Sequence, residues 1–447
     1  MTIELRSLAV DEWRELARER ESAGEAVPDA ATSERLQEVF GAALSIEAAV
    51  RTILADVRAR GDAAVREWTA RADGARVESL RVPTGAAADA ERALEPRLRN
   101  ALLAAAERIR GFHECQVADL SARGTSSVQL RPEPLTRVGC YTPGGRAAYP
   151  STVLMTVIPA QVAGVGAIAL ASPPDDEGRV HPLVLASAHL VGVDEVYAIG
   201  GAQAVGALAF GTQTIARVDK VVGPGNAFVT AAKRMIFGAV GIDQLAGPSE
   251  IVVVASEGAE AELIAADLVS QLEHDTLAWA ACFTDNPTLA SALVEQFAAQ
   301  AERAQRSGIV GSAAGSHAAV VTCESLEVAL RLAEEFAPEH LSLQGPAAEL
   351  LRDRVRSAGA VFCGAFSPVS IGDYVAGPNH TLPTQGAARH RGPLSVLDFV
   401  RWPSVTQLSE SEFEALAPIA CILAEAEGLH GHAAAIRVRM AHADSSA

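Results

Sequence analysis

Hydrophobic and polar positions alternate between residues 137 and 256 in a way that predicts strands and helices in turn. Short apolar runs bounded by turn residues predict strands at 137–140, 167–171, 195–199, 220–222 and 251–254. The stretches between them predict helices at 153–163, 182–191, 203–210 and 227–237. Strand–helix alternation of this kind builds a parallel sheet with helices on both faces, so we expect an α/β fold.

A second alternating block follows the first. It contains expected strands at 277–283, 318–322 and 360–363 and expected helices at 259–274, 287–304, 326–335 and 347–357. A stretch of Gly, Pro and polar residues at 364–403 predicts a functional loop, because long irregular segments in compact proteins usually carry function. From about residue 410 the pattern is helical again.

The part before residue 137 is less regular. Residues 1–43 are rich in Arg and Glu and predict a polar arm of two short helices. Helical periodicity then begins at Ile46, and a long helix is expected at 87–112. The apolar stretch 152–172 is about as long as a membrane span, but Pro159 and Gly164 break it, so we interpret it as a buried helix, turn and strand.

Composition and charge exclude some partners. The 447 residues carry a net charge of −18, which argues against nucleic acid, since phosphate binding needs clustered Lys and Arg. The start of the chain lacks the basic and apolar blocks of a secretion signal, and the six cysteines are scattered. We therefore expect reduced thiols in a cytoplasmic protein with no membrane partner.

Three turns that contain glycine follow expected strands, at 141–145, 200–203 and 223–226. Ligands of open α/β sheets bind beyond the carboxyl ends of the strands, where glycine lets the backbone approach a pyrophosphate. Gly223 and Gly225 give only a near miss to the dinucleotide fingerprint, because Phe228 stands in its last glycine position. Plain turns or helix ends explain the same glycines, so both interpretations stay open.

Glu339 and His340 are adjacent in sequence, directly after Pro338. A carboxylate and an imidazole can each move a proton near neutral pH, which predicts a pair of proton carriers. Pro338 should favour extended backbone in the residue before it, and extended neighbours point their side chains apart. The alternative is an ordinary solvated surface pair.

Gln271 and His274 are three residues apart near the end of an expected helix, so they share one face. With Asp373 in the loop and His432 in the terminal helix they form a candidate metal site. Two imidazoles and two oxygen donors suit zinc, although cobalt or manganese can occupy similar ligands. Polar groups that only make hydrogen bonds at helix ends are the alternative.

Four further positions have a functional and a structural interpretation. Ser249 is a candidate substrate contact or a turn residue, and His380 a candidate contact or a residue that satisfies its own loop. Glu427 precedes a helix-ending glycine and is a candidate contact or a solvated carboxylate. Cys140 can be considered as a nucleophile, but no base adjoins it, so we expect a buried, inert thiol.

Several segments together resemble the histidinol dehydrogenase family. They are 141–150, 220–230, 246–250, 270–275, 337–340 and 372–383, and 58–62 nearer the front. The resemblance extends from about Ile46 to Arg439 with all segments in the same order. Only roughly the first 45 residues look unlike the family.

The resemblance implies an enzyme of histidine biosynthesis that oxidises L-histidinol twice, through L-histidinal, to L-histidine. It implies NAD and one zinc ion per subunit as cofactors, and a homodimer with shared active sites. Glu339 and His340 would be catalytic. By motif position the remaining roles are zinc binding by Gln271, His274, Asp373 and His432, cofactor contacts by Tyr141, Gln203 and Asn226, and substrate contacts by Ser249, His340, His380, Glu427 and the zinc ligands.

The expected architecture has two incomplete Rossmann-like parallel-sheet domains with small helical segments for dimerisation at both termini. We expect an NAD-binding domain at 137–250. A second domain at 44–136 and 251–394 would carry most zinc ligands and the Glu–His pair, flanked by the arm 1–43 and a tail 395–447. In the family that tail reaches the neighbouring subunit, so Glu427 and His432 would serve the partner's site.

Three other functions fit part of the pattern. A member of the same family can act on another small alcohol. A zinc hydrolase can use Glu339 to activate a metal-bound water, with the glycine turns then purely structural. A binding module without catalysis fits poorly with so many groups that can carry protons.

Overall fold

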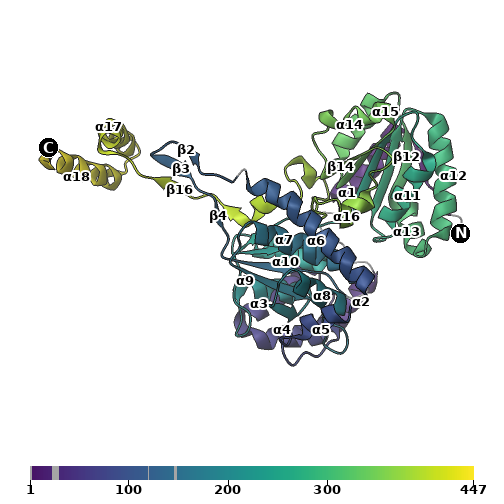
Figure 1. Ribbon diagram of the computed structural model, residues 1–447, viewed down its shortest axis with the longest axis horizontal. Coiled ribbons are helices and arrows are strands. Elements are labelled where there is room, and N and C mark those ends of the chain that lie inside the picture. Colours follow the sequence, from purple (N-terminus) through teal and green to yellow (C-terminus); the bar gives the residue numbers. More distant parts are fainter. Residues whose placement is uncertain (1–2, 23–29, 119, 145–147, 447) are drawn as a thin grey trace. The chain divides into compact units, whose positions relative to one another are not determined.

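The computed structural model describes residues 3–22, 30–118, 120–144 and 148–446 (Figure 1). Its contacts divide the chain into two compact units. The first comprises residues 1–117 and 135–399, and the second comprises 118–134 and 400–447. No helix among the described residues is long and apolar enough to cross a membrane.

A six-stranded parallel sheet forms one half of the first unit. Its strands lie in the order β1-β12-β11-β10-β13-β14. Their bounds are Arg6–Leu8 (β1), Glu250–Ala255 (β10), Trp279–Thr284 (β11), Ala318–Thr322 (β12), His340–Gln344 (β13) and Ala360–Cys363 (β14). Every neighbouring pair is parallel. The central strands β10 and β11 are buried along their whole length, as expected of a sheet covered on both faces.

Helices cover both faces of this sheet because alternate strand residues feed two separate hydrophobic clusters. Ile251 and Val253 join one cluster with helices α11 (Ala261–Leu272), α12 (Pro287–Arg303) and α13 (Ser307–His317). Val252 and Val254 join the other with α1 (Val10–Ser22) and α14 (Leu326–Phe336). Figure 1 shows the purple N-terminal elements within the green body of this sheet.

A five-stranded parallel sheet forms the other half of the first unit, in the order β7-β6-β5-β8-β9. Its strands are Arg137–Tyr141 (β5), Ala167–Ser172 (β6), Val196–Ala198 (β7), Lys220–Val222 (β8) and Gly241–Ile242 (β9). The connecting helices are Pro150–Val162 (α7), Pro182–Leu190 (α8), Gly201–Phe210 (α9) and Ala227–Ile236 (α10). The stretch 152–172 is thus a helix, a turn and a strand, as its proline and glycine predicted.

Without β1, both sheets have the strand order 3-2-1-4-5 along the chain. In each sheet the order reverses next to the first strand, between β5 and β8 in one and between β10 and β13 in the other. Doubly wound sheets bind ligands at such a point of reversal. The α/β class and the two Rossmann-like sheets expected from the sequence are confirmed.

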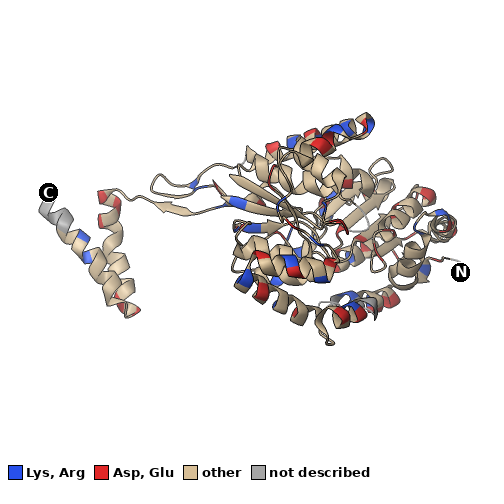
Figure 2. Cartoon of the chain, turned by 90° about the horizontal axis from the view of Figure 1, so that it is seen from below, with Lys and Arg blue, Asp and Glu red and all other residues tan. Residues whose placement is uncertain are grey.

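Helices from residues 46–117 contact the helices of the five-stranded sheet. They are α3 (Ile46–Arg60), α4 (Asp62–Trp68), the π-helical turn η1 (Thr69–Asp73), α5 (Ala86–Arg92) and α6 (Pro96–Val117). α3 packs on α9 and α10, α5 on α8, and α6 on α7. The expected domains instead grouped 44–136 with 251–394, because sequence order alone does not show which sheet a helical segment covers. Figure 2 shows the acidic and basic residues mainly on helices, while the strands are mostly uncharged.

Some local expectations were wrong. The two short helices expected in the arm are present, as α1 and α2 (Ala30–Phe40), but the arm also contains β1, which pairs with β12. It is not polar throughout, because Trp13 of α1 is buried against Trp279, Phe283 and Phe336. The expected helix 87–112 is interrupted between α5 and α6, and 347–357 is reduced to short turns, α15 (Pro346–Glu349) and η2 (Arg352–Arg354). The elements that were missed include α13 and the strand β13 that begins at His340.

The second unit contains two small antiparallel sheets and a helical pair. β16 (Ser404–Thr406), β3 (Val128–Leu130) and β2 (Arg123–Gly124) form one sheet, and β15 (Val400–Arg401) with β4 (Glu133–Pro134) forms the other. The helices are α17 (Glu410–Ala426) and α18 (His430–Ser446), which contact each other. Ser409 and Glu412 form a capping box at the start of α17.

Candidate active site

The Glu–His pair lies at the amino edge of the six-stranded sheet. His340 is the first residue of β13 and stands beside Ile251 of β10. Both side chains are buried, Glu339 to 7% and His340 to 4% exposure, which excludes the interpretation as a solvated surface pair. Backbone hydrogen bonds from Gly359 to Pro338 and from Ala360 to Glu339 attach the turn to the start of β14.

Glu250 holds this pair through its backbone. Its N–H donates to Oε2 of Glu339 at 2.9 Å, and its carbonyl oxygen accepts a hydrogen bond from Nδ1 of His340 at 2.9 Å. In return, the N–H of Glu339 donates to Oε2 of Glu250 at 3.2 Å. Because a carbonyl can only accept, Nδ1 of His340 carries a proton. Nε2 of His340 is buried with no hydrogen-bond partner among the described residues.

Burial and charge shift the pKa values of both groups. Burial raises the pKa of Glu339 to about 7, against the opposing attraction of His340. For His340 burial works toward a lower pKa, but the carboxylates of Glu339 and Asp373 outweigh it and raise the pKa to about 9. Glu339 Oε2 lies 3.5 Å from His340 Nδ1, and Asp373 Oδ1 lies 3.7 Å from His340 Nε2. The two residues therefore titrate as a coupled pair near neutral pH.

Three candidate metal ligands come from two elements that contact each other, α11 and α16 (Val369–Tyr374). Gln271 is 3% exposed, and its amide nitrogen has no hydrogen-bond partner among the described residues. His274 follows the end of α11 and is exposed, and the charge of Asp373 acts on its imidazole. Asp373 is on α16, not in an irregular loop as expected, because α16 packs Gly372 against the ring of Phe362.

Asp373 also contacts His380. The backbone carbonyl of Asp373 accepts a hydrogen bond from Nδ1 of His380 at 2.9 Å, and the hydroxyl of Thr152 lies 3.4 Å from its Nε2. Burial lowers the pKa of His380, and the imidazoles of His340 and His380 help to keep the pKa of Asp373 below its ordinary value despite burial. Both nitrogens of His380 thus have protein neighbours.

Ser249 stands directly before β10, half-buried, and its carbonyl accepts a hydrogen bond from the N–H of Trp279. Glu427 and His432 belong to the second unit, where both are exposed. No three His, Cys, Asp or Glu side chains within the described ranges lie close enough to hold a metal ion by themselves.

The cofactor candidates lie at the carboxyl edge of the five-stranded sheet. Tyr141 ends β5, Gln203 is in the first turn of α9 after β7, and Asn226 follows β8. The hydroxyl of Tyr141 accepts a hydrogen bond from the N–H of Gly201 at 3.2 Å. Asn226 caps α10 by accepting from the N–H groups of Phe228 and Val229. These are the positions that the glycine turns predicted.

Gly223 is required at this edge. Its φ is +113°, and a Cβ there would overlap the carbonyl oxygen of Tyr141 on the neighbouring strand. Nearby Cys140 is fully buried, which raises the pKa of its thiol to about 12. The expectation of a buried thiol is therefore confirmed, and such burial disfavours the reactive thiolate.

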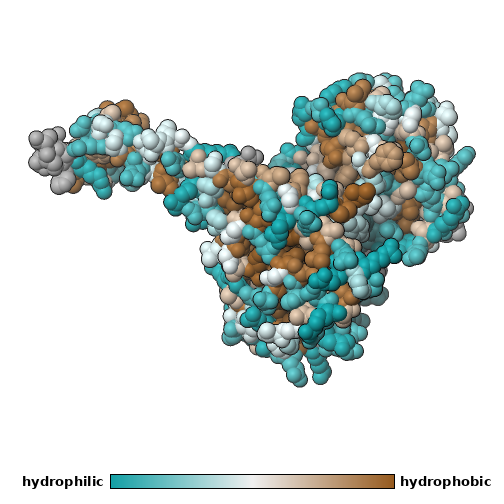
Figure 3. Space-filling view, viewed as in Figure 1, coloured by the Kyte–Doolittle hydropathy of each residue, from teal (hydrophilic) through white to brown (hydrophobic). Residues whose placement is uncertain are grey.

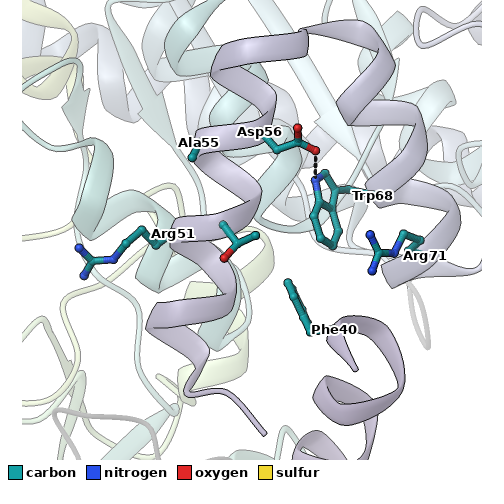
Figure 4. Close-up of a pocket in the computed structure, with 7 residues that line it drawn as sticks. Phe40, Arg51, Ala55, Asp56, Trp68 and Arg71 are labelled. Carbon is teal, nitrogen blue, oxygen red and sulfur yellow. Dashed lines mark hydrogen bonds between the residues drawn. The ribbon is translucent and has the colours of Figure 1, made fainter. Parts of the chain in front are cut away.

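A surface hollow of about 660 Å³ lies elsewhere, between α2 (Ala30–Phe40), α3, α4 and η1. Figure 4 shows Trp68 donating to Asp56, with Phe40 and Arg71 on either side of the indole. None of the candidate site residues lines this hollow. This hollow is therefore separate from the candidate site residues.

Comparison with known proteins settles the family. The family model for histidinol dehydrogenase matches residues 40–440. The chain is 47% identical over 398 residues to histidinol dehydrogenase of Parasynechococcus marenigrum, covering 88% of this chain and 91% of that one. It is 43% identical to histidinol dehydrogenase of Methanosarcina barkeri, covering 89% and 92%.

The chain belongs to the histidinol dehydrogenase family. A crystal structure of histidinol dehydrogenase from Elizabethkingia anophelis has the same fold, with a TM-score of 0.87 and 33% identity over 98% of this chain and 99% of that one. The resemblance noted in the sequence is thereby confirmed, and so is the fold that it implied.

Sequence reasoning missed three residues that contact the candidates. Glu250 ends the segment 246–250, but only its neighbour Ser249 was singled out. Asp73 accepts a hydrogen bond from Nε2 of Gln203 at 2.8 Å. Arg20 binds Glu250 from the N-terminal arm. Glu250 directly precedes the expected strand 251–254, and this position could have identified it from the sequence. Asp73 and Arg20 are identified only by their long-range contacts in the structure.

The buried carboxyl group of Asp73 should make the stability of the protein depend on pH. Burial raises its pKa to about 6, so the folded state binds this proton more tightly than the unfolded chain, whose carboxyl group has the ordinary value of 3.8. The contribution of this carboxyl group to the free energy of unfolding is fully present below pH 3.8 and is lost as the pH rises through 6. Asp73→Asn keeps an oxygen acceptor for Gln203 and should raise the free energy of unfolding at pH 7.5 by on the order of 1 kcal/mol.

Urea denaturation of both proteins at several pH values measures this difference. The advantage of Asp73→Asn should shrink as the pH falls from about 7 to 4. Asp176→Asn, at an exposed carboxylate, is the control and should show no such trend. An advantage of Asp73→Asn that does not depend on pH would contradict the assignment.

Proposed function

We propose that the protein oxidises L-histidinol to L-histidine through L-histidinal, with NAD as hydride acceptor and zinc in the site. Membership of the family supports the reaction. The observation that carries the site is the grouping of Glu339, His340 and Asp373 at the amino edge of the six-stranded sheet. A closely related enzyme acting on another small alcohol is the alternative.

The donors fit a zinc ion. We assign Gln271, His274 and Asp373 from one subunit and His432 from its partner as ligands. The amide oxygen of buried Gln271 and the carboxylate of Asp373 are oxygen donors that suit a cation. No ion pair of Asp373 with a Lys or Arg is found in the described part of the chain, so its charge is available to a metal ion. When bound there, the metal ion would hold the substrate's nitrogen atoms and offset the charge of Asp373, which raises the pKa of His340.

His340 serves as the first base in this proposal. Since Nδ1 donates to the carbonyl of Glu250, the lone pair of the neutral ring is on Nε2, which faces Asp373. Nε2 takes the hydroxyl proton of L-histidinol while the carbinol carbon gives its hydride to NAD. His340 acts again on the hydrated aldehyde. The second hydride then leaves to a second NAD, and the new oxygen of the carboxylate comes from water.

Glu339 serves as the base that draws a proton from the attacking water. A carboxyl group with a pKa of about 7 is well matched to proton transfer at neutral pH. Its Oε2 is fixed by the N–H of Glu250, so the carboxylate has a defined orientation. Ser249, His380 and Glu427 are assigned to the substrate, with Glu427 supplied by the partner.

NAD would bind at the carboxyl edge of the five-stranded sheet, where its order reverses between β5 and β8. Tyr141, Gln203 and Asn226 follow three strands at this edge. Asn226 uses its Oδ1 as the helix cap, which leaves its Nδ2 for the cofactor.

A homodimer with shared sites is part of the proposal. α17 exposes Leu416, Ile419, Ile422 and Leu423, which follow one another at helical spacing and form an apolar row. Figure 3 shows brown hydrophobic side chains at the surface of the second unit, which contains α17. A second copy of the chain would bury this row and supply His432 and Glu427. The described cysteines are all free, which suits the expected cytoplasmic location.

The reaction has a clear stoichiometric test. Purified zinc-loaded protein given L-histidinol and excess NAD should form two NADH for each L-histidine, measured at 340 nm and by chromatography. Amino alcohols without an imidazole should give none. One NADH per substrate would contradict the double oxidation, and the absence of NADH would leave a hydrolase as the better interpretation.

Separate roles for the two bases predict different kinetic defects. Glu339→Gln should slow oxidation of L-histidinal by roughly 10²–10⁴-fold while slowing oxidation of L-histidinol much less. His340→Ala should slow both steps. Single-turnover measurements started from either substrate make the comparison. Equal losses in both steps for Glu339→Gln would refute the division of roles.

Shared sites predict complementation between two inactive variants. His274→Ala and His432→Ala homodimers should each lose zinc on dialysis. In a heterodimer, however, one site combines both wild-type residues, so co-expression should recover about a quarter of wild-type activity and zinc. His274→Ala with Asp373→Ala is the matched control and should recover nothing, since both residues come from the same subunit's body. No recovery in the first pair would contradict the shared site.

A further inference from the structure

Glu250 is a fully buried carboxylate with four hydrogen-bond donors. Arg20 supplies two of them, from Nε to Oε1 and from Nη2 to Oε2, each at 2.6 Å. The N–H groups of Gln385 and Glu339 supply the others at 3.0 and 3.2 Å. A carboxylate with paired guanidinium contacts and two amides has a fixed position, because each of its oxygens accepts from two directions.

Arg20 holds the Glu–His turn at both of its ends. At one end it fixes the carboxylate of Glu250, which accepts from the N–H of Glu339. At the other end its Nη1 donates to the carbonyl oxygen of Phe336 at 2.5 Å, and its guanidinium lies 3.8 Å from the centre of the Phe336 ring. Phe336 is the last residue of α14, so Arg20 connects the end of that helix with the start of the catalytic turn.

Arg20 also balances the negative charge of the buried Glu250 carboxylate. Glu250 and Glu339 are both buried, and the charge of Glu250 helps to raise the pKa of Glu339. Arg20 is 6% exposed and is the cation paired with Glu250. A buried carboxylate needs such a partner. Without Arg20, the reciprocal pairing would place the carboxylates of Glu250 and Glu339 side by side with no cation paired to Glu250.

We propose that Arg20 and Glu250 are positioning residues for the reaction, and that the N-terminal helix α1 is thereby part of the catalytic apparatus. The ion pair fixes the turn 336–340 so that Glu339 and His340 present one geometry to the substrate. The inference rests on the proposed function, because it takes the Glu–His pair as the bases. It gives the arm a role in the subunit's own site.

Arg14 provides a matched control on the same helix. It makes a two-fold ion pair with Glu335 of α14 at 3.0 and 3.1 Å, so it also attaches α1 to the six-stranded sheet's helices. Its contacts involve neither Glu250 nor the turn 336–340, and the pair is exposed. Loss of Arg14 therefore tests attachment of the arm alone, whereas loss of Arg20 tests attachment and positioning together.

The decisive variant is Arg20→Met/Glu250→Gln, compared with wild type and Arg14→Ala as zinc-loaded proteins. Removing both charges leaves no buried ion without a partner, so the double variant should keep its melting temperature close to that of the control. Its kcat for L-histidinol and for L-histidinal should nevertheless fall by roughly ten- to a hundredfold, since small displacements of catalytic groups carry losses of that size. KM and zinc content should stay within about twofold of wild type.

Chemical rescue adds a readout that a purely structural role would not change. Arg20→Ala leaves a space shaped for a guanidinium group. Millimolar guanidinium chloride should therefore raise the kcat of this variant several-fold. Sodium chloride at the same concentration should not. Arg14→Ala should show no response to either salt. If Arg20→Ala proves insoluble, the double variant still decides the question.

The outcomes separate this inference from the proposed function. A wild-type protein that forms no NADH from L-histidinol would overturn the function and the inference with it. A wild type that turns over, together with a double variant whose kcat is within twofold of it, would overturn the inference alone. The inference would also fail if kcat fell only in proportion to the loss of folded protein or zinc.

Discussion

The structure around the candidate site depends on one arrangement, the reciprocal pairing of two buried glutamates. The N–H of Glu250 donates to the carboxylate of Glu339, and the N–H of Glu339 donates to the carboxylate of Glu250. This exchange ties Glu250, the first residue of β10, to Glu339, the residue directly before β13. It also leaves the carbonyl of Glu250 free to set the tautomer of His340.

Two sheets with the same strand order use opposite edges. The five-stranded sheet presents Tyr141 and the glycine turns at its carboxyl edge, the usual ligand edge of doubly wound sheets. The six-stranded sheet presents the Glu–His pair at its amino edge. The reason lies in α11, which leaves β10 at the carboxyl edge and returns antiparallel to it, so that Gln271 and His274 come back to the amino edge where β13 begins. The proposed metal ligands Gln271 and His274 and the proposed bases thus lie at the same edge.

The regular elements could be predicted because their signal is local. Strands such as Lys220–Val222 and Ala318–Thr322 were placed from apolar runs between turn residues. The strand β13 was missed because its core positions Leu341 and Leu343 alternate with polar residues that are buried by tertiary contacts, Ser342 and Gln344. The partners of Glu250 could not be predicted either, since Arg20 lies 230 residues away and in a segment that looked like a solvated arm.

The turn that carries the bases shows how tertiary constraints override a local rule. Pro338 predicted extended backbone at Ala337, yet Ala337 has φ +49° and ψ +67°, because it ends α14 in the left-handed conformation with its N–H bonded to Ala333. Such a conformation costs about 1 kcal/mol for a residue with a Cβ. The neighbouring side chains also converge instead of pointing apart, with 3.5 Å between Glu339 Oε2 and His340 Nδ1.

That convergence changes how the two bases relate to each other. Side chains that pointed apart would titrate independently, one for each half of the reaction. Side chains 3.5 Å apart interact electrostatically. A proton on His340 therefore stabilises the ionised form of Glu339, and the carboxylate in turn favours the imidazolium. In the proposed reaction, a proton that His340 accepts would therefore favour the carboxylate form of Glu339, the form that the water step needs. The protonation state of each proposed base would then depend on that of the other.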